Sequence, residues 1–178
     1  MIGRLRAALA ARAARTAIVA RRPAPPRRVP ERRLLLVLPP DDAGQAAAWA
    51  LVERLGLAPA RVTAVVAGDH IGPAPFAFTG RIVALDADAL DWRRIPTRAV
   101  LDAAWADAPD VAVDLAAPDD LAAALLVGAS PAAVRIGRHR LDREPFFDLM
   151  IGATPDAASA AEALGRLLRQ LDPPVLPV

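Results

Sequence analysis

The sequence predicts an α/β fold: a three-layer, Rossmann-like, mostly parallel sheet of about six strands, preceded by a basic N-terminal helix. Short apolar runs alternate with Ala- and Leu-rich segments of helical length, which is the pattern of successive βα units. Several of these runs are continuously apolar, as in strands buried on both faces. A chain of 178 residues with 54% hydrophobic side chains suffices for one domain with a sizeable core.

The N-terminal part is expected to lie outside this domain. Residues 1–22 favour a basic amphipathic helix, since Ala and Arg dominate and no proline intervenes. Residues 23–31 hold four prolines and form a stiff extended linker. The Rossmann-like domain is expected over 32–172, with a tail over 173–178.

The first half of the domain begins with an expected strand over 33–38, ended by two prolines. Asp41 or Asp42 would cap a helix that runs to about Leu55, where a glycine ends it. Further strands are expected over 61–67 and 81–85, separated by a loop rich in Pro and Gly.

The second half continues the alternation with a helix over 97–106 and a strand over 110–115. Pro118 is placed in the first turn of a helix that ends near Gly128. The remaining elements are expected as strands over 133–137 and 146–151 and a last helix from Pro155 to about Leu171. Right-handed crossovers between these parallel strands give a doubly wound sheet.

The composition excludes several kinds of chemistry. Without cysteine the chain has no disulfide, thiolate zinc site or cysteine nucleophile, and without lysine it has no Schiff-base or Walker-type lysine. The two serines, Ser130 and Ser159, fall in a turn and in a helix, which argues against a Ser-His-Asp triad. We therefore assign no catalytic residue and no cofactor.

The charge is divided unevenly along the chain. Residues 1–33 hold ten arginines and one acid, a net charge of +9, whereas residues 34–178 hold 12 arginines and 19 acids, a net charge of −7. Such an arm is typical of a contact with RNA, an anionic membrane surface or an acidic protein. The alternatives are a solvated tail and docking on the acidic body. The arginines expected to contact a polyanion are Arg4, Arg12, Arg15, Arg21, Arg22, Arg27 and Arg28.

No apolar stretch is long enough to span a bilayer, since the densest run covers only Leu34 to Leu38. Arginines also interrupt the segment in which a signal peptide would need its apolar region. The expected location is the cytoplasm of a bacterium.

Five places in the sequence are candidate sites. The turn Leu38-Pro-Pro-Asp-Asp-Ala-Gly44 lacks the glycines of a dinucleotide cradle, and its acids would repel phosphate. Asp86 and Asp88 follow a strand and would hold a divalent ion, or else lie in a solvated turn. Asp114 would reach the sheet edge, or else serve as a buried hydrogen-bond acceptor. His139 lies among charged residues in an exposed connection, and a lone His70 follows the second strand.

The stretch 109–137 resembles the N-terminal domain of heptosyltransferase-type glycosyltransferases. It contains an Asp-Val-Ala-Val-Asp-Leu strand, an Ala/Leu helix, a Gly-Ala turn and an Arg-Ile-Gly strand. Those enzymes bind their nucleotide-sugar donor in a second domain, so the resemblance implies that catalysis would need a partner chain.

Most of the chain is similar to a small bacterial family known as a domain of unknown function. The sharpest shared element is Phe-Asp-Leu-Met-Ile, which begins at Phe147 in this chain. In the family the motif usually ends in an acid, whereas Gly152 stands at that place here. The resemblance implies no activity.

These observations favour a non-catalytic Rossmann-like binding or scaffold protein whose Arg-rich arm contacts a polyanion or an acidic partner. The alternative is a split or degenerate glycosyltransferase-like half domain. A third reading is an accessory protein of RNA or the ribosome.

Overall fold

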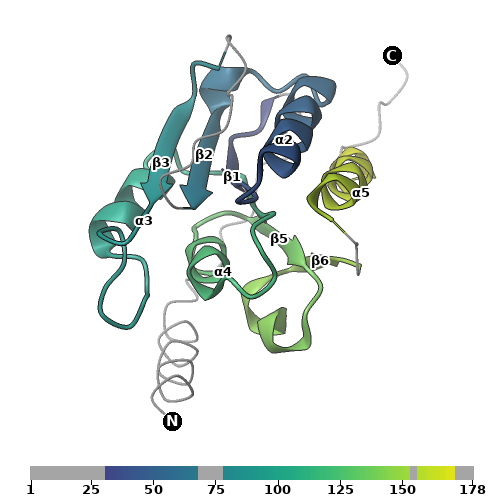
Figure 1. Ribbon diagram of the computed structural model, residues 1–178. Coiled ribbons are helices and arrows are strands. Elements are labelled where there is room, and N and C mark those ends of the chain that lie inside the picture. Colours follow the sequence, from purple (N-terminus) through teal and green to yellow (C-terminus); the bar gives the residue numbers. More distant parts are fainter. Residues whose placement is uncertain (1–30, 68–77, 153–155, 171–178) are drawn as a thin grey trace, which may run out of the picture.

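The protein contains a six-stranded sheet in which every strand pair is parallel, in the order β3-β2-β1-β4-β5-β6 (Figure 1). The computed structural model describes residues 31–67, 78–152 and 156–170. The arm over 1–30, including all seven arginines expected to contact a polyanion, lies outside these residues. The strands are β1 (Leu34–Val37), β2 (Val62–Ala67), β3 (Arg81–Leu85), β4 (Val111–Asp114), β5 (Val134–Arg138) and β6 (Leu149–Ile151).

Helices cover both faces of the sheet, which confirms the expected three-layer arrangement (Figure 1). One face is covered by α2 (Asp42–Arg54) and α5 (Ala157–Gln170), and the other by α3 (Arg98–Trp105) and α4 (Leu121–Gly128). Successive residues of a strand point to opposite faces, so both layers draw on the same apolar runs. In β1, Leu34 and Leu36 join the cluster under α2, while Leu35 joins the cluster under α4.

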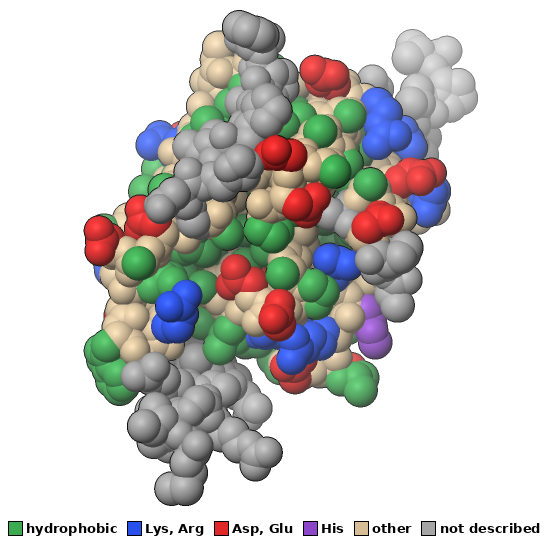
Figure 2. Space-filling view, viewed as in Figure 1, with side chains coloured by type: hydrophobic (Ala, Val, Ile, Leu, Met, Phe, Trp, Pro, Cys, Tyr) green, Lys and Arg blue, Asp and Glu red, His purple; other side chains and the backbone are tan. Residues whose placement is uncertain are grey.

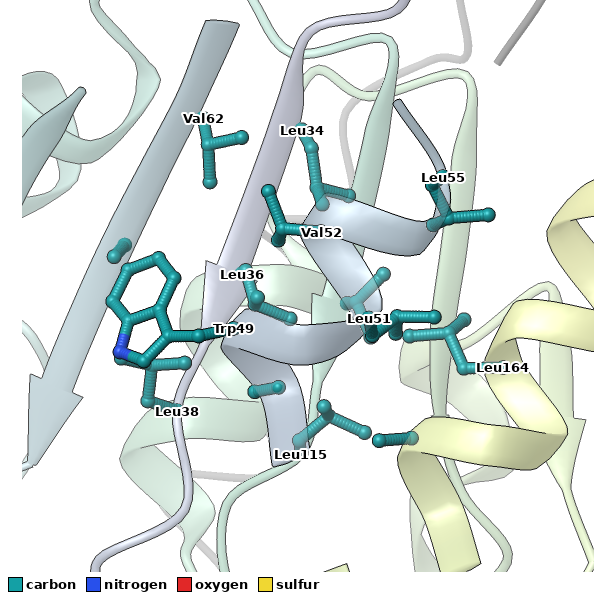
Figure 3. Close-up of a cluster of buried hydrophobic side chains, with 14 of the residues drawn as sticks. Leu34, Leu36, Leu38, Trp49, Leu51, Val52, Leu55, Val62, Leu115 and Leu164 are labelled. Carbon is teal, nitrogen blue, oxygen red and sulfur yellow. The ribbon is translucent and has the colours of Figure 1, made fainter. Parts of the chain in front are cut away.

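The core under α2 and α5 is built from large aliphatic side chains. Figure 3 shows Leu51 of α2 directed toward Leu164 of α5, with Leu36 of β1 and Leu115, which follows β4, in the same cluster. Leu36, Leu115 and Leu164 are fully buried. Close packing of this kind fixes the two helices against the sheet.

The core under α4 is thinner and depends on small residues. All but the first residue of α4 are buried, and most of them are Ala, Leu or Val. A Cβ atom added at Gly128 would collide with Phe146, and one at Gly137 would collide with the ring of Phe147. Glycine at these two positions therefore makes room for the two phenylalanine rings.

Two predicted boundaries were wrong. The last strand begins at Leu149 rather than at residue 146, because Phe146 ends a 3-10 segment over Leu141–Phe146 and both phenylalanines turn into the α4 core. Pro118 lies before α4 rather than in its first turn, because Asp120 caps that helix.

A buried ion pair ties β5 to the approach of β6. The Arg135 Nε lies 3.3 Å from the Asp148 carboxylate, and their side chains are only 3% and 12% exposed. The same carboxylate accepts from the Arg135 amide, and the Arg135 guanidinium also donates to the carbonyl of Gly128. Asp148 of the Phe-Asp-Leu-Met-Ile motif thus anchors the strand that carries Arg-Ile-Gly.

Candidate functional site

A hollow among the described residues lies at the carboxyl edge of the sheet. Strand order reverses between β1 and β4, and ligands of open α/β sheets bind beside such a reversal, outside the carboxyl ends of the strands. A cleft of about 700 Å³ opens there. Figure 2 shows acidic and basic side chains around a mostly apolar hollow on this face. The lining residues are Pro40, Ala67, Leu85, Asp86, Ala87, Leu90, Arg93, Arg94, Ala116, Ala117, Asp119, Asp120, Leu121 and Ala122.

The N-termini of two helices beside the cleft are capped by carboxylates. Asp41 accepts from the Gly44 amide of α2 at 2.8 Å, and Asp120 accepts from the Ala123 amide of α4 at 3.0 Å. The Gln45 side chain donates to the Pro39 carbonyl and fixes the turn before α2. Free amides at a helix N-terminus are what binds phosphate in nucleotide folds. Here each cap takes such an amide and adds a negative charge, so an anionic ligand needs another partner.

The loop after β3, residues 86–97, forms a basic wall of the cleft. The Asp91 carboxylate accepts from the amides of Arg93 and Ile95 and pairs with the Arg93 side chain at 2.9 Å. Burial works to raise the pKa of Asp91, but the hydrogen bonds from Ile95 and Arg93 outweigh it and hold the pKa below its ordinary value. Asp91 thus organises the loop and neutralises Arg93.

Arg94 is the second guanidinium on this wall. Its φ of 62° lies in the left-handed region, which costs a non-glycine residue roughly 1–2 kcal/mol. Within the described part of the chain its side chain has neither an ion pair nor a hydrogen bond. Arg94 therefore brings to the cleft a positive charge that no described side chain neutralises.

The loop after β4, residues 115–120, forms an acidic wall. Asp119 and Asp120 line the cleft there. Two arginines form hydrogen bonds to the backbone of this loop. Arg140 donates to the Pro118 carbonyl at 3.0 Å, and Arg143 donates to the Asp119 carbonyl at 3.2 Å. The two arginines bind the backbone of this loop, and no described residue forms an ion pair with the Asp119 carboxylate.

Asp114 lies at the carboxyl end of β4, where this loop begins. Its side chain accepts from the Ala116 amide at 3.0 Å, which confirms the buried-acceptor reading. Burial raises the pKa of Asp114 to about 7, and the negative charge of Asp120 adds to this effect. The hydrogen bond from the Ala116 amide and the positive charges of Arg143 and Arg138 act in the opposite direction. The carboxyl group is therefore about half ionised at neutral pH.

The two residues expected to hold a metal ion, Asp86 and Asp88, differ in their position relative to the cleft. Asp86 lines the cleft and accepts from the Ala89 amide at 2.9 Å, whereas Asp88 is exposed and does not line it. Across 31–67, 78–152 and 156–170, no three His, Asp or Glu side chains are arranged to hold a metal ion. Asp86 serves here as a turn-forming residue at the edge of the cleft.

The remaining predicted residues lie away from the cleft lining. His139 is exposed in the connection after β5, as expected, and Ser159 lies within α5. Ser130 is buried in the turn after α4, and its hydroxyl has no hydrogen-bond partner among the described residues. His70 falls outside the described residues.

Sequence reasoning missed Arg93, Arg94 and Asp119 as site residues. A signal was present, since Trp92-Arg-Arg follows a predicted strand and its loop lies at the ligand-binding edge. The exposed Trp92 side chain, with the Arg93 guanidinium 5.7 Å from its ring centre, is a further sign of a surface loop built for contact.

Comparison with family models, with curated proteins and with solved structures gave no match for this chain. Among the helices that the structure describes, none has both the length and the apolar character to cross a membrane.

Proposed function

We propose that this protein is a non-catalytic binding protein of the bacterial cytoplasm that holds a small molecule with an acidic group in the cleft. The observation that carries the proposal is Arg94, which has a strained backbone and lines a cleft at the strand-order reversal, with no ion pair to any described residue. Backbone strain is maintained where the surrounding structure has a use for it. Its planar fork suits a carboxylate or a phosphate.

The carboxylate caps support the same assignment. With Asp41 and Asp120 closing the helix N-termini, an acidic group is directed away from the usual cradle and toward Arg94. The Arg-rich segment over residues 1–33 completes the proposal: it attaches the protein to a polyanion or an acidic partner.

Replacing Arg94 by glutamine tests the cleft. Small carboxylates and phosphates are screened by thermal shift, and a binder of the full-length chain is expected to lose at least about tenfold in affinity in Arg94→Gln, because a charge-assisted contact is worth roughly 1.5–3 kcal/mol. Arg98→Gln is the matched control, since Arg98 is exposed on α3 and paired with Asp102. Equal affinity in both variants would remove Arg94 from the site.

The same screen contains nucleotide sugars. A saturable shift with a nucleotide sugar, unchanged in Arg94→Gln, would favour the alternative of a glycosyltransferase-like half domain over the binding protein.

Neutralising the arm tests the polyanion contact. Substituting glutamine for Arg4, Arg12, Arg15, Arg21, Arg22, Arg27 and Arg28 is expected to weaken binding to single-stranded RNA and to flatten its dependence on salt. Each arginine that contacts a phosphate contributes about 0.7 to the slope of log K against log salt for a single strand. Fluorescence anisotropy at several salt concentrations measures this slope, and an unchanged slope would contradict the contact.

A further inference from the structure

The two loops that line the cleft bring charges of both signs. Asp86, Arg93 and Arg94 lie on the loop after β3, and Asp119 and Asp120 lie on the loop after β4, with the apolar ends of the strands between them. Arg93 is paired with Asp91, and the Asp86 and Asp120 carboxylates accept from backbone amides. Among the described residues, the charged side chains of the lining with neither a hydrogen bond nor an ion pair are the guanidinium of Arg94 and the carboxylate of Asp119.

The carboxylates of the cleft exceed its cations. Asp86 and Asp120 each use one oxygen, Oδ1, to accept from a backbone amide, and Arg143 offsets part of the charge of Asp120. A ligand with only an acidic group would gain from Arg94 but would be repelled by these carboxylates and by Asp119. A ligand with only a positive charge would leave Arg94 without a partner.

The floor between the walls is apolar. It is formed by residues at the ends of four neighbouring strands, Pro40, Ala67, Leu85 and Ala116. About 700 Å³ is within the range of small-molecule sites and holds a molecule of the size of a short peptide. Small side chains at the floor leave this space open.

We infer that the ligand is a zwitterion of the amino-acid or short-peptide class, with its carboxylate on Arg94, its ammonium group on Asp119 and its apolar part on the strand ends. This inference rests on the proposed function and specifies its ligand. A cation and a carboxylate that line the same cleft suit the two ends of such a molecule.

Three forms of one tripeptide test the inference by calorimetry with the full-length chain: Ala-Leu-Ala with free ends, the same peptide N-acetylated, and the same peptide as its C-terminal amide. The free peptide is expected to bind at least about tenfold more tightly than either blocked form. Asp119→Asn is expected to abolish the preference for the free amine, and Arg94→Gln the preference for the free carboxylate.

Asp88→Asn is the matched control, since Asp88 is exposed on the loop after β3 and does not line the cleft. It is expected to leave both preferences intact. If the acetylated peptide binds as well as the free one, the ligand is a simple acid: the zwitterion is overturned while the proposed function stands. If only the amide binds, or if no carboxylate or phosphate of any kind binds, both are overturned.

Discussion

Replacing Arg135 by methionine is expected to lower the free energy of unfolding by about 3–5 kcal/mol. The substitution removes a buried guanidinium and leaves the Asp148 carboxylate, 12% exposed, without the cation that lies 3.3 Å away. It also deprives the buried Gly128 carbonyl of a donor. The cost arises mainly from the loss of a charge-assisted contact at a buried site, so urea denaturation at neutral pH should show the full effect.

Two variants distinguish the effect of losing the Arg135 charge from the effect of losing its packing. The double variant Arg135→Met, Asp148→Leu removes both charges and is expected to recover a large part of the loss, because an apolar pair replaces an ion pair at little cost. Arg98→Met removes one partner of an exposed pair on α3 and is expected to change stability by less than about 1 kcal/mol. Equal losses for Arg135→Met and Arg98→Met would contradict the role of burial.

Replacing Asp114 by asparagine is expected to stabilise the protein above neutral pH. Because burial raises the pKa of Asp114 to about 7 from 3.8, the folded protein holds a proton that the unfolded chain releases. The wild-type chain is therefore most stable below pH 3.8 with respect to this group, and it loses stability as the pH rises toward 7. Asparagine does not titrate and keeps an oxygen for the Ala116 amide.

Urea denaturation of both chains at pH 5 and at pH 8 measures this linkage. The stability of Asp114→Asn relative to the wild type should rise by about 3 kcal/mol between the two values, at 1.36 kcal/mol for each pKa unit. Asp110→Asn serves as a control at the other end of β4, where the carboxylate accepts from the Arg33 amide near the surface. A difference that does not change with pH would show that Asp114 is ionised throughout.

The three layers and the parallel sheet could be predicted because the apolar runs are short and separated by clear breaks. The run Leu34–Leu38 forms a strand buried on both faces, and Asp41 caps the next helix as expected. Phe146 and Phe147 gave the wrong strand boundary because their apolar character fits a strand as well as a packed turn. In the folded chain the two rings occupy the space that Gly128 and Gly137 leave open, which favours the packed turn over the strand.

The candidate site could be predicted only in part. Asp86 and Asp114 stand at strand ends and were noticed for that reason, but only one of the two turned out to line the cleft. Arg94 was missed because its importance comes from a left-handed backbone and an unpaired charge, which single-residue patterns do not reveal. The distribution of counter-charges among neighbours is a property of the folded chain.

Arg94 and Asp119 lie on connections that contribute no residue to the strand register, while the Asp120 cap and the buried Arg135–Asp148 pair hold the framework. Homologues can therefore exchange the side chains at these two positions and acquire new selectivity at little cost to folding. In this architecture, ligand preference should diverge faster than the scaffold.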